Sequence, residues 1–340
     1  MILNKENMLK KASFLIASVF AISAMAQKTE VGVMVLAHGA GTQWNQLVTD
    51  ATREIASKYP TEVAFGMALP RTMQVAIDKL EARGAKKIVV VPLFISSHSF
   101  IIRQSEYLLG VRQDLADPPM VMDHGPGDGK EIGGGSTGHA GHGTPAGDHG
   151  GHGNGHGQAS SGGHDMHGQS ASLPRLTLDS EIKFTRPLDD HPLVAQILAD
   201  RIMELSKEPS KELVVLVGHG PNPEDDNKKW VADMESLADQ VRELQKKSGR
   251  ESKMILAMTV RDDADAAIYN QAKENLRNVV SQGSRQGTVI VIPVFLSSGS
   301  VEQKVVSRLE GLTYTWIGKT LLPDPRINEF IRLSVENALK

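Results

Sequence analysis

The chain carries the same order of motifs twice, and this repeat limits its possible folds more than any other feature. Residues 31–48 (VGVMVLAHGAGTQWNQLV) and 212–231 (ELVVLVGHGPNPEDDNKKWV) each run from an apolar stretch into His-Gly, a polar loop and a helical pattern. Residues 85–100 (AKKIVVVPLFISSHSF) match residues 287–301 (GTVIVIPVFLSSGSV) in an apolar run, a proline and two serines. The chain is therefore predicted to be a duplication of one folding unit.

Each half ends in a third matched motif, which consists of a short strand pattern, a proline-containing loop and an amphipathic helix. This motif spans residues 181–205 in the first half and 312–339 in the second. Short continuous apolar runs are typical of strands buried on both faces of a parallel sheet, and helical patterns alternate with them here. The pattern predicts an α/β fold with two similar flavodoxin-like parallel-sheet domains, at residues 27–208 and 209–340.

A glycine- and histidine-rich insertion interrupts the first half between its third and fourth predicted strands, at residues 120–175. Because it has few apolar residues to bury and much glycine to order, it is predicted to be disordered. Spaced histidines in a flexible segment bind divalent metals weakly, so the segment is expected to gather metal for the folded domains. An inert spacer and a metal store are the alternatives. The predicted ligands are His139, His142, His149, His152, His156, His164 and His167.

The N-terminus has the pattern of a secretory signal peptide. Lys5, Lys10 and Lys11 precede a short apolar core, and Ala24-Met25-Ala26 forms a small-x-small cleavage site. A membrane anchor is the alternative, but the apolar run is shorter than the roughly 20 residues that span a bilayer. Residues 1–26 are therefore predicted to direct export to the periplasm or the medium, with no stable membrane insertion after cleavage.

Composition excludes several classes of site. The chain has no cysteine, which rules out disulfides, iron–sulfur clusters and thiolate zinc sites. Its formal net charge of −3 leaves no basic footprint for nucleic acid. No glycine-rich phosphate loop follows a strand and opens a helix, so no organic cofactor is implied. Any metal must be bound by imidazole, carboxylate or carbonyl groups.

Three histidines stand where the predicted strands end. His38 and His219 follow the first strand of each half, and His98 follows the third strand of the first half. Ligands of parallel α/β sheets bind beyond the carboxyl ends of the strands. Neutral imidazole binds Co²⁺, Ni²⁺, Fe²⁺ and Zn²⁺ and also accepts protons near neutral pH, so these three residues are the candidate catalytic and metal-binding residues. Alternatively, each histidine hydrogen-bonds a loop carbonyl.

Other polar residues near these motifs are predicted to be structural. His191 precedes Pro192 at a helix start, and we expect it to support that helix. Glu224, Asp225 and Asp226 are expected to form a solvated helix N-terminus, where the helix dipole favours negative charge.

The same motifs carry a resemblance to a known family. VLAHGAGTQWN and VLVGHGPNPEDDNKKW, with Asn45 and Asn227, resemble the opening strand of the sirohydrochlorin cobaltochelatase and ferrochelatase family, the type II tetrapyrrole chelatases. VVVPLFISSH, IVIPVFLSSG and RPLDDHPLVAQILADRI resemble the family's third-strand and closing motifs. The resemblance implies two chelatase-like domains facing a cleft, and an ATP-independent lyase that inserts Co²⁺, or Ni²⁺ or Fe²⁺, into a tetrapyrrole such as sirohydrochlorin.

The resemblance also suggests residue roles and a place in cobalamin or porphyrin biosynthesis. His38 and His219 fall on the family's first histidine position. The second position lies two residues after His98, at Phe100, and the second half has Gly299 in the region that corresponds to His98. One active centre built around the first half is therefore expected. Trp44 and Trp230 are the candidates for stacking on a tetrapyrrole.

Two other functions fit the same sequence besides that of a chelatase. The first is an exported carrier of metal or tetrapyrrole that has lost turnover. The second is a metal buffer whose histidine-rich insertion is the functional part. Because one chain supplies both halves, a monomer is expected.

Overall fold

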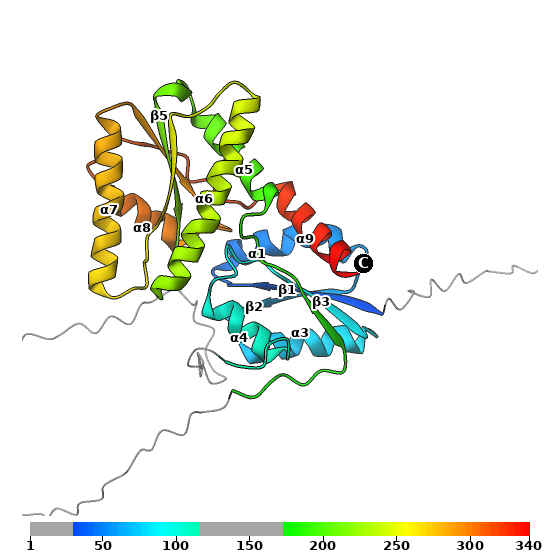
Figure 1. Cartoon of the computed structure of the whole chain (residues 1–340). Helices are drawn as coiled ribbons and strands as arrows, with labels where there is room; N and C mark the ends of the chain where they lie inside the picture. The colour runs from blue at the N-terminus through cyan, green and yellow to red at the C-terminus, as the bar shows by residue number, and fades with distance from the viewer. Residues whose placement is uncertain (1–29, 116–172) are drawn as a thin grey trace, which may run out of the picture.

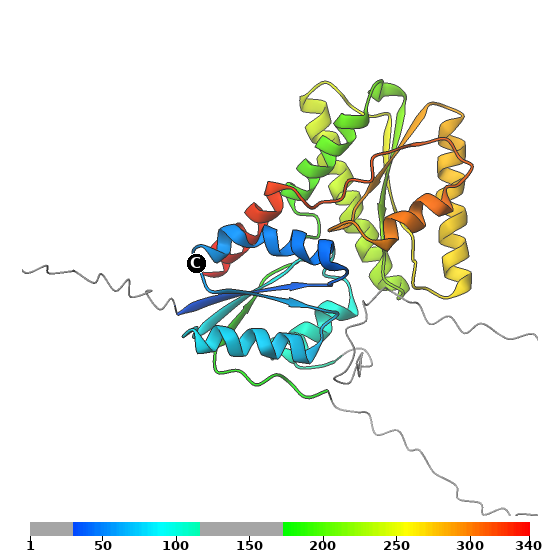
Figure 2. The same cartoon turned by 180° about the vertical axis from the view of Figure 1, so that it is seen from behind.

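The computed structural model describes residues 30–115 and 173–340, which form two α/β domains (Figures 1 and 2). The predicted signal peptide and all seven predicted metal ligands of the insertion lie outside the described residues, so those predictions stay predictions. In the part of the chain that is described, no helix has the length and apolar character needed to cross a membrane.

The first domain contains a four-stranded parallel sheet in the order β2-β1-β3-β4. Alternate residues of the central strands point to opposite faces, as the strand period requires. Met34 and Leu36 pack under helices α3 and α4, whereas Val33 and Val35 pack under α1 and α2. The strands are β1 (Val31–Ala37), β2 (Thr61–Phe65), β3 (Lys87–Pro92) and β4 (Glu181–Phe184), and the helices are α1 (Thr42–Ala51), α2 (Arg53–Ala56), α3 (Pro70–Ala82) and α4 (Phe100–Leu108).

The second domain repeats this topology in the order β6-β5-β7-β8, again with parallel neighbours. The fold class predicted from the repeat is thus confirmed. A short 3₁₀ helix, Pro209–Lys211, leads into this domain. Its strands are β5 (Glu212–Gly218), β6 (Met254–Thr259), β7 (Thr288–Pro293) and β8 (Thr315–Trp316), and its helices are α6 (Glu224–Lys247), α7 (Ala266–Ser284) and α8 (Ser300–Arg308).

The closing helices of the two halves are exchanged. Helix α5 (Pro192–Leu205) ends the first half of the sequence but packs against α6 and β7. Helix α9 (Pro325–Ala338) ends the chain but packs against α1, α2 and β3, as the red helix beside the first sheet in Figure 1 shows. Each half therefore completes the core of the other, and one apolar cluster runs through both domains.

This exchange ties the two domains together through apolar burial. Ile327, Phe330 and Ile331 of α9 are almost fully buried in the shared core. Burying a side chain of this size stabilises a fold by about 1.5 to 3 kcal/mol. Separating the two sheets would expose these side chains, so the shared core holds the strand ends of both domains in one arrangement.

Candidate metal-handling site

Both His-Gly motifs adopt the same local structure after the first strand of each domain. Nδ1 of His38 lies 2.7 Å from the carbonyl oxygen of Gly39, and Nδ1 of His219 lies 3.0 Å from that of Gly220. A carbonyl can only accept, so Nδ1 of each ring carries a proton, and in the neutral imidazole Nε2 keeps its lone pair. Gly39 and Gly220 have φ of 77° and 76°, a conformation that glycine adopts without steric cost.

The two asparagines of the repeat hold these loops in place. Oδ1 of Asn45 accepts a hydrogen bond of 2.9 Å from the backbone N–H of Ala40. Oδ1 of Asn227 accepts one of 2.8 Å from the hydroxyl of Thr259, at the end of β6. A Cβ added at Gly220 would lie only 2.5 Å from Cβ of Thr259, so this loop passes close to the neighbouring strand. Asn45 therefore holds the His38 loop directly, whereas Asn227 and Thr259 together pack against Gly220 of the other loop.

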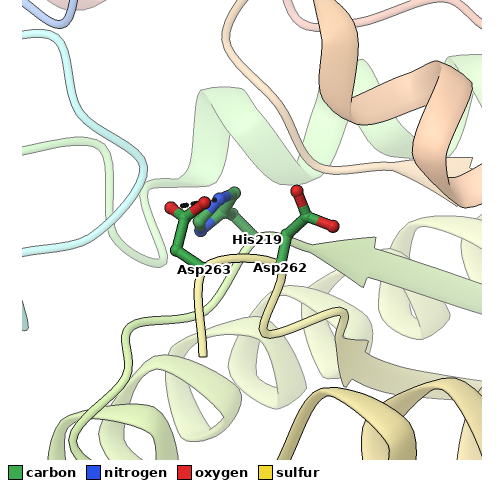
Figure 3. Close-up of side chains that lie close together, drawn as sticks. All are labelled: His219, Asp262 and Asp263. Atoms are coloured by element: carbon green, nitrogen blue, oxygen red, sulfur yellow. Dashed lines mark ion pairs between the residues drawn. The ribbon is translucent and has the colours of Figure 1, made fainter. Parts of the chain in front are cut away.

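His219 faces the loop that follows β6 in its own domain. Its Nε2 lies 3.3 Å from Oδ2 of Asp263, as Figure 3 shows. Burial acts to lower the pKa of His219, but the hydrogen bond and charge of Asp263 outweigh it, and the pKa is raised from 6.5. The hydrogen bond from His219 lowers the pKa of Asp263, so this carboxylate is anionic at neutral pH.

His38 of the first domain acts on the same carboxylate. Its charge, like that of Lys304, further lowers the pKa of Asp263. Strand-end histidines from both halves therefore act on one acidic group, Asp263. The sequence repeat predicted that His38 and His219 occupy equivalent positions, and the fold brings both into the neighbourhood of this carboxylate.

Asp262 completes a set of three potential metal ligands. Each of three residues, His219, Asp262 and Asp263, offers one ligand atom, and these atoms lie within 4.8 Å of one another. No other such group of three occurs among residues 30–115 and 173–340. The carboxylate of Asp262 is directed away from the other two side chains in Figure 3. It is 2 % exposed and is held by Arg308 and Lys304. His219 and Asp263 are thus better placed than Asp262 to contact a metal ion.

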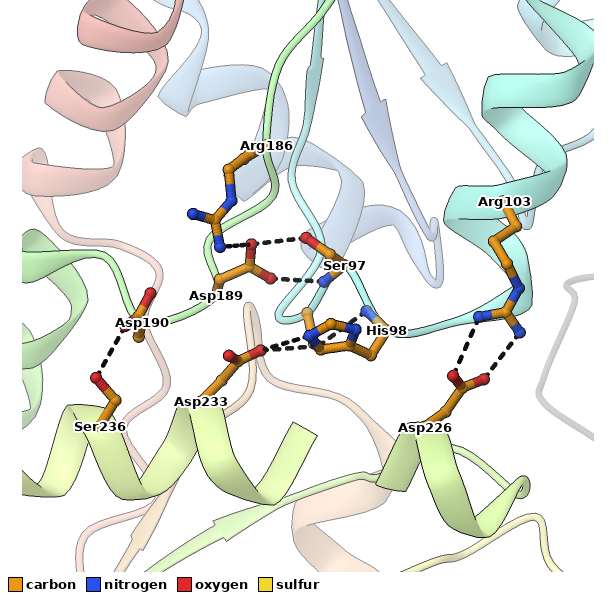
Figure 4. A network of polar contacts seen from close by, with 10 residues as sticks. Ser97, His98, Arg103, Arg186, Asp189, Asp190, Asp226, Asp233 and Ser236 are labelled. Atoms are coloured by element: carbon orange, nitrogen blue, oxygen red, sulfur yellow. Dashed lines mark hydrogen bonds and ion pairs between the residues drawn. The ribbon is translucent and has the colours of Figure 1, made fainter. Parts of the chain in front are cut away.

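His98 lies at the boundary between the domains and outside this set of ligands. Its Nε2 is 3.6 Å from Oδ2 of Asp233, a residue of α6 in the second domain. Ser96 joins the two residues, because its hydroxyl accepts from the backbone N–H of His98 and donates to Asp233 at 3.3 Å (Figure 4). Burial raises the pKa of Asp233. The structure therefore places His98 in an interdomain contact.

A second interdomain contact corrects an expectation from the sequence. Asp226 does not belong to a solvated helix end: it is 8 % exposed and accepts hydrogen bonds of 3.2 and 2.8 Å from Arg103 (Figure 4). Glu224 and Asp225 are exposed as expected, and Glu224 lies 3.0 Å from Arg261. The expectation was wrong for Asp226 because its partner comes from the other domain, which a local pattern cannot reveal.

The loop that carries His98 is fixed from the first domain as well. Asp189 accepts hydrogen bonds of 2.6 Å from both the backbone N–H and the hydroxyl of Ser97. Arg186 donates to the same carboxylate at 3.1 Å. The motif RPLDDHP, which the sequence analysis treated as a closing signature, therefore has a local task of holding the loop after β3.

The remaining histidine and the two tryptophans have distinct surroundings. Nδ1 of His191 accepts from the backbone N–H of Leu193 at 3.2 Å and thereby caps α5, which agrees with the structural role expected. Trp230 packs beneath β5, and its Nε1 is buried without a hydrogen-bond partner. Trp44 approaches the second domain, because a Cβ added at Gly299 would lie 3.9 Å from its Cδ1.

Asp233, Asp262 and Asp263 were not predicted from the sequence. A signal for the last two was present, since VRDDADA follows the apolar run of β6 and thus places two acids at the carboxyl end of a strand. Asp233 lies within α6, and nothing in its helical pattern singles it out.

A cavity of about 280 Å³ lies elsewhere, between α5, α6 and the start of α9, and none of the site residues lines it. Its walls include Gln196, Met203, Leu244 and Arg326. It is therefore separate from the residues described above.

Comparisons with known proteins agree with this architecture. Residues 32–104 match the family model of CbiX. The structure is similar to SirB from Bacillus subtilis with Fe³⁺, at 14 % identity and a TM-score of 0.54, over 91 % of this chain and 96 % of that chain. It is also similar to the sirohydrochlorin chelatase SirB from Bacillus subtilis subspecies spizizenii in complex with cobalt, at 13 % identity and a TM-score of 0.50, over 91 % and 95 %. No curated protein matches the sequence.

Proposed function

We propose that the chain is a metal chelatase. The proposal is supported by the match of residues 32–104 to the CbiX family model and by the similarity of the fold to that of SirB. The chain inserts a divalent metal into a tetrapyrrole such as sirohydrochlorin without ATP. The observation that carries the proposal is the pairing of His219 with Asp263, a carboxylate on which the charge of His38 also acts from the other domain.

The metal substrate is held by few ligands. Nε2 of His219 and a carboxylate oxygen of Asp263 are the nearest candidates, and the charge of His38 acts on Asp263 from the first domain. A site with few protein ligands leaves coordination positions open, and open positions let an ion pass to the nitrogens of an acceptor. This differs from a closed structural site, which would retain its ion.

Insertion also requires proton acceptors. Each divalent ion that enters a tetrapyrrole replaces two protons on pyrrole nitrogens. Once the ion has left its Nε2, His219 is suited to accept one of these protons, because Asp263 raises its pKa and stabilises the imidazolium form. His38 is the candidate acceptor for the second proton, and His98 stays a candidate at the domain boundary with its Asp233 partner.

Co²⁺ is the proposed metal, with Ni²⁺, Fe²⁺ and Zn²⁺ as competitors. Imidazole and carboxylate ligands suit all four ions, so ligand type alone does not select one. The two similar SirB structures were solved with Fe³⁺ and with cobalt.

We further propose that residues 1–26 direct export, and that the insertion histidines gather metal for His38 and His219. The role of the insertion is supported by the spacing of its histidines and by its position after the strand that leads to His98.

The function is tested by mixing the full mature chain with sirohydrochlorin and Co²⁺ under anaerobic conditions and following the absorbance of the tetrapyrrole. We expect insertion well above the uncatalysed rate. His219→Ala and His38→Ala should each slow it by about 100-fold or more, as loss of a general base does. His191→Asn is the matched control, because asparagine also caps a helix N-terminus and the residue lies outside the site.

An exported carrier is the second candidate function. Gly299 stands where the first half has His98, and His98 itself is engaged by Asp233, which reduces the number of histidines available for turnover. A chain that binds Co²⁺ through His219 but leaves the insertion rate at its uncatalysed value would be a carrier. A chain in which both substitutions leave the rate unchanged would refute the proposed site.

A further inference from the structure

We propose that Lys304 of α8 weakens the hold of His219 and Asp263 on the metal substrate, so that the ion is released to its acceptor. The inference rests on the proposed function, since it concerns the same metal. It assigns a task to a lysine that contacts none of the three strand-end histidines.

Lys304 is bound to the aspartate beside the site. Its Nζ donates to Oδ2 of Asp262, and Asp262 also accepts from Arg308 at 2.9 Å. One oxygen of Asp262 lies within 4.8 Å of the ligand atoms of His219 and Asp263. The ammonium group is therefore separated from the proposed metal position by a single carboxylate.

Arg308 also holds Asp262 and its loop. It is 1 % exposed, its guanidinium lies 4.1 Å from the ring centroid of Tyr269, and it also donates to the carbonyl of Val260. Lys304 is 43 % exposed and adds a second cation to a carboxylate that is already paired. The fold therefore has no evident need for the charge of Lys304.

Two cations on one carboxylate leave a net positive charge beside the site. This charge lies beside the metal ligands, since Lys304 is bound to Asp262, and one oxygen of Asp262 is within 4.8 Å of the ligand atoms of His219 and Asp263. The same charge repels a divalent cation. At a separation of several ångströms and a water-like dielectric, the repulsion between charges of +1 and +2 corresponds to about a three- to tenfold change in affinity.

The repeat provides an internal comparison. Lys304 follows Pro293 by the same number of residues as Arg103 follows Pro92. Arg103 forms two hydrogen bonds to Asp226 of the other domain and serves the interface. Lys304 is directed instead toward Asp262 within its own domain. The second half thus places the cation that corresponds to Arg103 beside the proposed metal site.

The test is a Co²⁺ competition titration against a chromophoric chelator, with the full chain. His219→Ala is measured first and identifies the binding step that belongs to this site. Lys304→Gln is then expected to tighten that step about three- to tenfold and to slow Co²⁺ release into excess EDTA by the same factor. The difference should shrink in 1 M salt, because screening weakens a charge effect.

Two control variants separate charge from structure. Lys304→Arg keeps the charge and should bind Co²⁺ like the wild type. Lys247→Gln removes the same charge from the far end of α6 and should also leave the affinity unchanged. A loss of structure would weaken binding, whereas the inference requires stronger binding.

The outcomes are distinguishable. If Lys304→Gln binds Co²⁺ with equal or lower affinity while His219→Ala removes a binding step, the role of Lys304 is refuted and the proposed function stands. If His219→Ala removes no binding step, the proposed metal site is wrong, and the inference about Lys304 falls with it.

Discussion

Arg103 of the first domain and Asp226 of the second are joined by two hydrogen bonds, of 3.2 and 2.8 Å, with both side chains largely buried. This contact, together with the one between His98 and Asp233, links the loop and helix after β3 to α6. The exchanged helices α5 and α9 hold the same two domains together from the core. Polar and apolar contacts therefore both fix how the strand ends of the two sheets meet.

Asp226→Asn should lower the free energy of unfolding by about 2 to 3 kcal/mol, because it leaves the guanidinium of Arg103 without a charged partner in a buried place. Chemical denaturation of the full chain measures the loss. Asp225→Asn is the matched control, since its ion pair with Lys228 is exposed and worth less than about 1 kcal/mol. Equal effects of the two substitutions would contradict the importance of the interdomain pair.

Gly220→Ala should destabilise the chain by about 1 to 3 kcal/mol, since φ of 76° is unfavourable for alanine and the new Cβ would clash with Thr259. Displacement of the loop should also weaken Co²⁺ binding through His219. Thermal unfolding and the chelator titration measure the two effects. Gly41→Ala should change stability by less than about 1 kcal/mol, because its φ is −62° and no atom lies within 4 Å of the added Cβ.

The ionisation of His219 should depend on Asp263. We expect an NMR titration of the His219 ring to give a pKa above 6.5, and Asp263→Asn to lower it. Because the folded pKa is raised, the histidine's contribution to stability is fully present below pH 6.5 and is lost as pH rises through the folded pKa. The stability difference between wild type and Asp263→Asn should therefore shrink above that pH. A pKa that Asp263→Asn leaves unchanged would disprove the coupling.

The affinity for Co²⁺ should also depend on the ionisation of His219, but it should increase with pH, whereas the stability contribution decreases. A proton and a metal ion compete for Nε2 of His219, so Co²⁺ affinity should rise as pH increases through the raised pKa. In Asp263→Asn the midpoint of this rise should move to lower pH, even if the maximal affinity falls. The chelator titration repeated across pH values measures both quantities, and an affinity independent of pH would argue against His219 as a ligand.

Deletion of residues 124–170 should slow metal insertion when Co²⁺ is limiting and leave it unchanged when Co²⁺ is saturating. The reason is that a tethered histidine tract raises the local metal concentration without taking part in the chemistry. The matched control keeps the segment length and replaces its histidines by asparagine. Unchanged turnover of the deletion variant at limiting metal would favour an inert spacer.

Much of the architecture was accessible from the sequence because it depends on short-range patterns. The apolar runs predicted the central strands, and the doubled motifs predicted two similar parallel sheets. The His-Gly pairs predicted strand-end histidines, and glycine is needed there for a backbone conformation set within a few residues. His191 before Pro192 likewise predicted a helix start, whose capping is also local.

The sequence by itself therefore determined the fold class, the repeat, and the places of His38 and His219 directly after the first strand of each domain, whereas His98 lies in the loop between β3 and α4. Only the tertiary structure decided which groups these side chains face. His219 faces Asp263, and His98 faces Asp233. Asp226 pairs with an arginine of the other domain. The tertiary structure also decided the exchange of α5 and α9. The physical reason is that hydrogen bonds and ion pairs act over a few ångströms, and residues far apart in the chain come that close only after the sheets have packed.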